Sequence, residues 1–150
     1  MNPIEDEKMP EIFCEIVVYF HNNDLNFAKE QLLALPIGPM ECKQDPLIKD
    51  YSYVSFARLY YKTFWDIDDA LTEMFAKIDP YLPQICEIAE QFHGRFIIDI
   101  ALCVYGAFPA LMFSGENMRK IHSMKADISI DPYYYGNVSN ETEEKAETAP

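Results

Sequence analysis

The chain has 150 residues, the size of one domain with its own core, and 49% of them are hydrophobic while 25% are charged. Its formal net charge is −13; residues 1–11 and 141–150 carry −3 each, which leaves −7 for residues 12–140. An acidic surface repels phosphate backbones and argues against nucleic acid as a partner, and no apolar run approaches the ~20 residues that a membrane span requires.

The first predicted elements are a strand and a helix. Residues 12–20 are β-branched and aromatic with neither face strongly polar, which favours a central strand. Residues 21–24 predict a turn and a helix cap, and apolar side chains then recur at helical spacing as far as Leu35. Three prolines and one glycine predict that residues 36–50 form a loop.

The middle of the chain predicts a long strand and two helices. Residues 51–65 predict the strand, and strict alternation puts Arg58 on the same face as Phe56. The helices are predicted over residues 66–78, which begin with a typical aspartate N-cap, and over residues 81–93. An Asp-Pro pair separates the two helices.

The C-terminal third predicts two more strands around a hairpin and a helix. Residues 95–104 are almost wholly apolar and predict a strand, and a hairpin connects it to a short strand over residues 108–113. A serine cap predicts a helix over residues 114–124, and alternating apolar side chains predict the last strand over residues 126–133.

These elements predict an α+β fold, a two-layer sandwich in which helices cover one face of a mainly antiparallel, ferredoxin-like sheet. Residues 1–11 form an acidic N-terminal segment, residues 12–136 a single α+β domain, and residues 137–150 an acidic tail that we expect to be disordered. The N-terminal segment has no apolar stretch typical of a secretion signal, so we expect a cytoplasmic protein.

Three aspartates are candidate site residues. Alternation puts Asp127 and Asp131 on the outer face of one strand about 13 Å apart, which is too far for a shared proton or one metal ion. Asp99 interrupts an apolar strand, so either that strand has a partly wet face or the carboxylate pairs with a cation or a tyrosine hydroxyl. Such a carboxylate is the first candidate for a perturbed site.

No pattern in the chain indicates a cofactor, a metal ion or a catalytic nucleophile. The four cysteines are far apart without a Cys-x-x-Cys pair, and the three histidines form no ligand spacing. The five glycines do not form a phosphate-binding loop. Aromatic rings near acids indicate a protein-binding surface instead, and the candidate binding residues outside the three aspartates are Trp65, Asp66, Tyr133 and Tyr135.

Several motifs resemble a known family. They are Trp65-Asp-Ile-Asp-Asp-Ala-Leu, the Ile78-Asp-Pro break, and Pro109-x-Leu-x-Phe-Ser-x-Glu with the following Ala126-Asp-Ile-Ser-Ile-Asp-x-Tyr. The chain resembles, over residues 12–135, a bacterial family of small α+β proteins of unknown function (the four-two-seven-nine type). Members of such families often lie beside toxin or defence genes, so the resemblance implies an immunity-type binding role and implies no catalytic residues.

We therefore expect a non-enzymatic, acidic protein-binding domain that docks a basic protein, such as a toxin that it neutralises. The alternative is a small-molecule-binding regulatory protein or a minor enzyme with a cleft near Asp99. A third possibility is a structural subunit that forms a homodimer through an edge strand.

Overall fold

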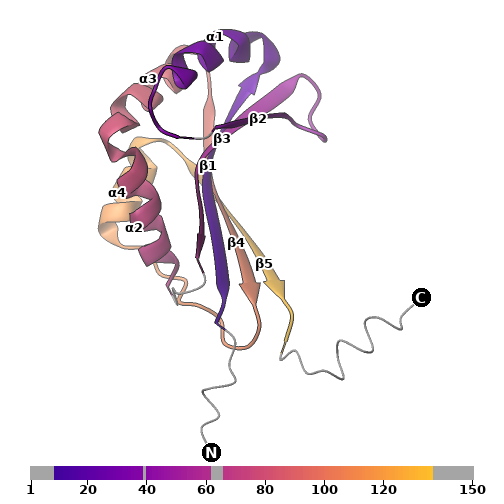
Figure 1. The fold of residues 1–150 in the computed structure, drawn as a ribbon, viewed down its shortest axis with the longest axis vertical. Coiled ribbons are helices and arrows are strands. Elements are labelled where there is room, and N and C mark those ends of the chain that lie inside the picture. Colours follow the sequence, from indigo (N-terminus) through magenta and orange to yellow (C-terminus); the bar gives the residue numbers. More distant parts are fainter. Residues whose placement is uncertain (1–8, 39, 62–65, 137–150) are drawn as a thin grey trace, which may run out of the picture.

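The computed structural model describes residues 9–38, 40–61 and 66–136. In chain order its elements are β1 (Glu11–His21), α1 (Asn22–Leu33), β2 (Glu41–Gln44), β3 (Tyr51–Tyr61), α2 (Ile67–Ile78), a 3-10 turn (Asp79–Tyr81), α3 (Leu82–Gln91), β4 (Arg95–Val104), α4 (Gly115–Ser123) and β5 (Asp127–Tyr134). The strands of the described residues form one five-stranded sheet. The helices gather on one face of the sheet and leave the other face uncovered (Figure 1). The predicted α+β class is therefore confirmed.

The strand order is β2-β3-β1-β4-β5, with β1 in the centre as predicted. β1 pairs antiparallel with β3 on one side and with β4 on the other, and β2 pairs antiparallel with β3. β5 pairs parallel with β4, because α4 carries the chain back to the end of the sheet where β4 begins. The sheet is thus mixed, with three antiparallel strand pairs and one parallel pair. The predicted ferredoxin-like, mainly antiparallel arrangement is therefore confirmed only in part.

The core lies between the helices and one face of the sheet. Even-numbered residues of β1 and β4 point into it, and Ile12, Ile16, Ile98 and Ile100 are fully buried. The apolar stripe of α2 packs onto this face, and its six side chains are all buried: Ile67, Ala70, Leu71, Met74, Phe75 and Ile78. Burial of each large side chain stabilises the fold by about 1.5–3 kcal/mol.

Polar contacts join α4 to α2. Asn117 is only 2% exposed, and its side-chain nitrogen donates to Asp68 Oδ1 at 2.8 Å and to Thr72 Oγ1 at 3.0 Å. The backbone N–H of Ser114, which is the predicted N-cap of α4, also donates to Asp68 Oδ1 at 2.8 Å. Partial burial alone would raise the pKa of Asp68, but these hydrogen bonds outweigh it and hold the pKa below its ordinary value.

The chain passes close to the ring of Phe20 directly after the end of α3. His93 takes the left-handed conformation (φ 58°) that ends the helix, a place where glycine is more usual. Gly94, the next residue, meets a different need. A Cβ atom on Gly94 would lie 2.7 Å from Cε1 of Phe20, a ring that is 1% exposed in the core.

The predicted strict alternation along β3 is wrong, because the strand contains a bulge. Its register against β1 shifts between Cys14 and Ile16, and Ala57 there has a φ of 54°. The extra residue reverses the alternation. Phe56 is fully buried, whereas Arg58 lies on the uncovered face and pairs with Glu15.

Two further predictions are corrected. The expected loop over residues 36–50 contains β2, a four-residue strand at the edge of the sheet. The expected strand over residues 108–113 is an irregular segment with a single bridge between Asp66 and Ala110. β5 occupies the place beside β4 where that strand would have to pair, and Pro109 lacks the N–H that a strand needs.

Parts of the domain prediction fall outside the described residues, namely residues 1–8 and the tail from 137 to 150. No helix in the described ranges is long and apolar enough to cross a membrane. The cytoplasmic location stays a prediction.

Candidate functional site

One face of the sheet has no helix over it (Figure 1). Odd-numbered residues of β1 and β4 point to it, and the strand registers bring their partners on β2, β3 and β5 to the same side. The surface is not a flat, fully wet sheet. Val17 and Ser55, near its centre, are 4% and 2% exposed.

Charge on the uncovered face is unbalanced. Its carboxylates are Glu11, Glu15, Glu41, Asp99, Asp127 and Asp131, and its cations are Lys43, Arg58 and Arg95. Each of the three cations already contacts a carboxylate of the same face, in the pairs Lys43–Glu41, Arg58–Glu15, Arg58–Glu41 and Arg95–Asp127. The three described cations of this face are therefore all engaged, and negative charge remains in excess.

Asp99 is one of the acidic residues of the uncovered face. It is directly opposite Glu15 on β1, and neither Asp99 nor Asp131 forms a hydrogen bond or an ion pair with another described residue. Burial raises the pKa of Asp99 above its ordinary value, and the carboxylates of Glu15 and Asp131 raise it further. Of the two environments that the sequence left open for Asp99, the partly wet strand face is the one observed. Arg58 binds Glu15 and Glu41 instead.

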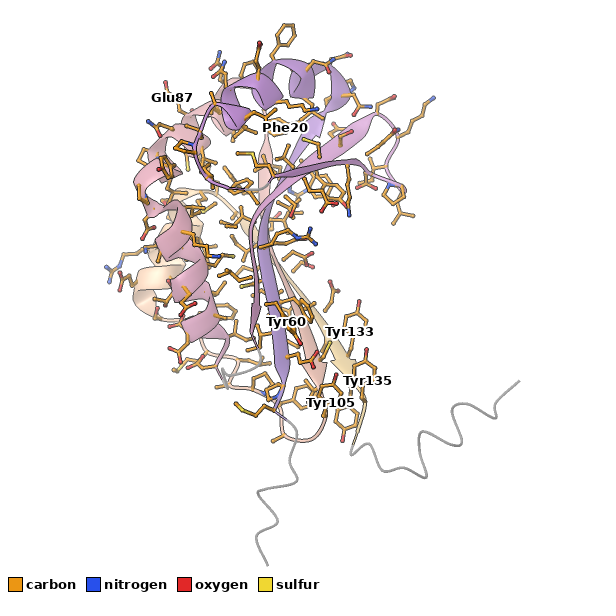
Figure 2. All side chains as sticks on the ribbon, in the orientation of Figure 1. Phe20, Tyr60, Glu87, Tyr105, Tyr133 and Tyr135 are labelled. Atoms are coloured by element: carbon orange, nitrogen blue, oxygen red, sulfur yellow. The ribbon has the colours of Figure 1, made fainter. Side chains whose placement is uncertain are left out.

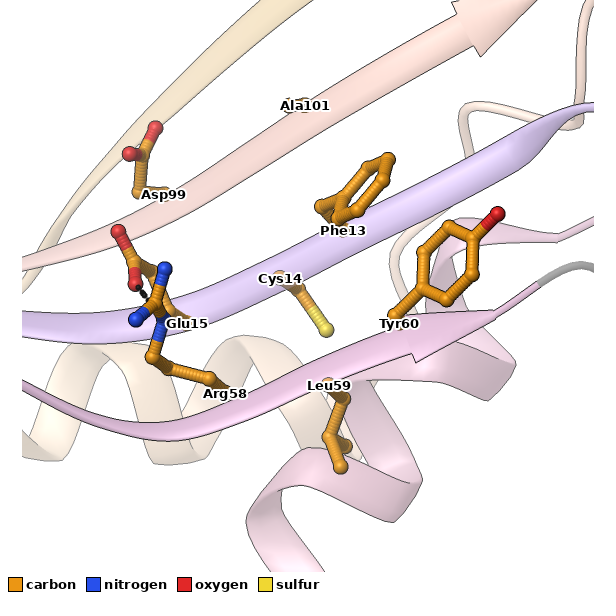
Figure 3. Close-up of a pocket in the computed structure, with 8 residues that line it drawn as sticks. All are labelled: Phe13, Cys14, Glu15, Arg58, Leu59, Tyr60, Asp99 and Ala101. Carbon is orange, nitrogen blue, oxygen red and sulfur yellow. Dashed lines mark ion pairs between the residues drawn. The ribbon is translucent and has the colours of Figure 1, made fainter. Parts of the chain in front are cut away.

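A depression of about 460 Å³ adjoins Asp99. Figure 3 shows the rings of Phe13 and Tyr60 side by side at one end, and Asp99 with the Glu15–Arg58 ion pair at the other. The two ring centroids are 4.4 Å apart with the planes tilted by 31°, and both side chains remain about 40–46% exposed. The depression thus combines an apolar end with an anionic end.

A second depression lies on the same face beyond Val17. It measures about 480 Å³ and is lined by Tyr19, Ile97, Arg95 and residues of the β2–β3 hairpin. Tyr19 packs against Tyr53 with ring centroids 5.3 Å apart. Aromatic side chains therefore flank the centre of the uncovered face at both ends.

The free edge of β5 is poorly suited to pairing with another strand. The N–H of Tyr135 donates to Val104 O at 2.8 Å, which places the backbone groups of odd-numbered residues toward β4. Those of the even-numbered residues therefore point outward, and Pro132 is one of them. Proline has no N–H, so the outer edge lacks one backbone hydrogen-bond donor, which disfavours pairing with a further strand.

The uncovered face brings together five of the seven residues predicted from the sequence. Asp99 lies on β4, and the parallel register carries Asp127, Asp131 and Tyr133 to the same side. Tyr135 directly follows β5 and lies near Tyr133 and Tyr105 (Figure 2). Tyr135 stacks on Tyr105 with ring centroids 5.3 Å apart.

The other two predicted residues do not lie on this surface. Asp66 is the N-cap of α2 and accepts from the N–H of Asp68 at 2.8 Å, so its role is structural. Trp65 lies outside the described residues.

Sequence reasoning missed the β1 and β3 side of the surface, namely Phe13, Glu15, Arg58 and Tyr60. Glu15 carried a signal, because a glutamate inside a strand that is otherwise apolar indicates a face that is not fully buried. Arg58 and Tyr60 could not be placed without knowledge of the bulge.

The side chains that line the depression beside Asp99 include one thiol. Cys14 borders the depression, but its side chain points to the core, and burial raises its pKa to about 12. No histidine lines the depression among the residues described. Those residues also contain no group of three or more His, Cys, Asp or Glu side chains that could hold a metal ion.

No protein-family model, curated protein or solved structure matches this chain. The function is therefore inferred from the chemistry of the uncovered face.

Proposed function

We propose that this chain is a non-enzymatic protein-binding domain that holds a basic protein against the uncovered face of its sheet. An immunity-type protein that neutralises a basic toxin would use such a surface. The observation that carries the proposal is the charge balance of the face, where three cations are all paired and six carboxylates are present. Complementary charge accelerates encounter with a basic partner and disfavours acidic ones.

The size of the uncovered face supports a protein partner. Strands lie ~4.8 Å apart and rise ~3.3 Å per residue, so β3, β1, β4 and β5 together span about 20 by 30 Å. This area is comparable with the ~800 Å² that each partner buries in a standard protein interface. Tyr60 and Tyr133 are 46% and 52% exposed, and exposed tyrosines on a charged surface are typical of such interfaces.

The alternative is a small-molecule site at Asp99. It is favoured by the volume of the adjoining depression, about 460 Å³, which falls in the range of ligand pockets. Catalysis there lacks a base–nucleophile pair, because the thiol of Cys14 faces the core. A homodimer through β5 is disfavoured by Pro132 on the outer edge.

The proposal is tested by retention of partners from host lysate on the immobilised protein. The wild type is compared with Asp131→Lys, which reverses charge on the uncovered face, and with Asp69→Lys, which makes the same change on the exposed side of α2. We expect a basic protein to be retained in low salt and weakened in about 0.5 M salt, where the Debye length is a few Å.

The two variants decide where binding occurs. Asp131→Lys should lose the basic protein, and Asp69→Lys should keep it. Equal retention by both variants would place the contact elsewhere and contradict the proposal. Retention that is indifferent to salt would contradict the electrostatic part of it.

A further inference from the structure

The depression beside Asp99 has a carboxylate that no cation of the described chain satisfies. Glu15 is held by Arg58, whose Nε lies 3.0 Å from Glu15 Oε2, and Asp127 is held by Arg95. Asp99 is partly buried between Glu15 and Asp131 and has no such contact. A half-buried carboxylate among other carboxylates is stabilised by any cation that reaches it.

The other end of the depression offers flat apolar surface. Phe13 and Tyr60 present adjacent rings, and the small side chain of Ala101 leaves the space between the rings and Asp99 open (Figure 3). A long side chain with an apolar stem and a cationic head matches both ends at once.

We propose that this depression receives one arginine side chain from the basic partner, with its guanidinium group against Asp99 and its stem across Ala101 toward Phe13 and Tyr60. The inference rests on the proposed function and names the residue that anchors the partner. Arginine fits better than lysine for two reasons. Its planar head pairs with a carboxylate through two parallel hydrogen bonds, and it keeps its charge when it is partly buried.

Other occupants fit the charge less well. The chain's own segment from residue 141 to 150 has a net charge of −3, so the face repels it. A second copy of the chain would bring the same acidic face and a net charge of −13. A phosphate or carboxylate ligand would meet Asp99, Glu15 and Asp131.

The test is an NMR titration of the ¹⁵N-labelled full chain with N-acetyl-argininamide at low ionic strength. N-acetyl-citrullinamide, which has nearly the same shape without the charge, is the matched control ligand. We expect amide shifts that centre on Phe13, Glu15, Asp99 and Ala101 with the arginine probe and none with citrulline. N-acetyl-lysinamide should bind more weakly at the same place.

Two protein variants test whether Asp99 is the carboxylate that binds the arginine probe. Asp99→Asn should weaken binding of the arginine probe about fivefold, whereas Asp69→Asn removes one charge from the helical layer and should leave it unchanged. The dispersion of the amide spectrum shows whether each variant is folded. Shifts spread over acidic residues of the whole surface, or equal affinity in the two variants, would overturn the arginine site.

The NMR titration and the capture of a partner from lysate can fail independently of each other. If the probe does not bind at Asp99 while Asp131→Lys still abolishes capture of the basic partner, the proposed function stands and the arginine site is wrong. If the probe binds at Asp99 but charge reversal on the uncovered face leaves partner capture intact, the site stands and the proposed function is wrong.

Discussion

Replacement of Asp99 by asparagine tests the electrostatics of the uncovered face in the free protein. Asp99 lies directly opposite Glu15, and both side chains are carboxylates. Like charges in this arrangement destabilise a sheet, and cross-strand pairs are worth about 0.2–1 kcal/mol. Because Arg58 lies 3.0 Å from Glu15 and offsets part of the repulsion, we expect Asp99→Asn to raise the free energy of unfolding at neutral pH by about 0.5 kcal/mol.

The pH dependence of this gain has a definite sign. The folded-state pKa of Asp99 is raised above its ordinary value of 3.8, by burial first and then by Glu15 and Asp131. Below pH 3.8 the carboxyl is protonated in both the folded and the unfolded chain, and it carries no penalty. As the pH rises through the raised pKa the folded state must take up an unfavourable charge, so stability is lost. In acid, Asp99→Asn should therefore be no more stable than the wild type. Above the folded-state pKa of Asp99, the variant should show its full increase in the free energy of unfolding.

Urea unfolding at a series of pH values measures the effect. With an m-value of about 1–3 kcal/mol/M, the midpoint at pH 7 should rise by about 0.2–0.5 M. Asp127→Asn is the matched control, because it removes a carboxylate of the same face that pairs with Arg95 and should lower the midpoint slightly or not at all. If Asp99→Asn is less stable at pH 7, or its advantage persists unchanged in acid, the account of its surroundings is wrong.

Three further predictions concern the scaffold. Gly94→Ala should lower the free energy of unfolding by about 1–3 kcal/mol, because its methyl group would overlap a buried ring; an unchanged urea midpoint would contradict this. Asn117→Ala should cost about 1.5–3 kcal/mol, because it removes a buried hydrogen bond to the charged Asp68, and a loss below ~0.5 kcal/mol would show that solvent replaces it. At pH 8 a thiol reagent should label the exposed Cys42 quickly and Cys14 only after unfolding, since the pKa of Cys14 is about 12; fast labelling of both thiols would refute its burial.

The helices could be predicted from the sequence because their signals are local. Ser114 is the N-cap of α4, and the apolar stripe of α2 is buried along its whole length. These patterns depend on neighbours within one or two turns. The same holds for the bounds of β4, which match the predicted residues 95–104.

The sheet pairing and the site could be predicted only in part because they depend on distant segments. Nothing within residues 126–133 indicates that this strand runs parallel to β4. Asp99 stood out as a single acid in an apolar strand, but its position opposite Glu15 follows from the register of two strands more than 80 residues apart. A left-handed Ala57 has no local signal, since that conformation usually belongs to glycine.

The bulge at Ala57 absorbs one residue of β3 for which regular pairing with β1 has no place. Deletion of Ala57 would bring Arg58 directly after Phe56, which faces the core, so simple alternation would still put Arg58 on the uncovered face. Glu15 would keep its cation, and Tyr60 would stay beside Phe13. A one-residue deletion at this place therefore preserves both faces of the sheet, whereas the same deletion in the regularly paired part of β1 would exchange them beyond that point.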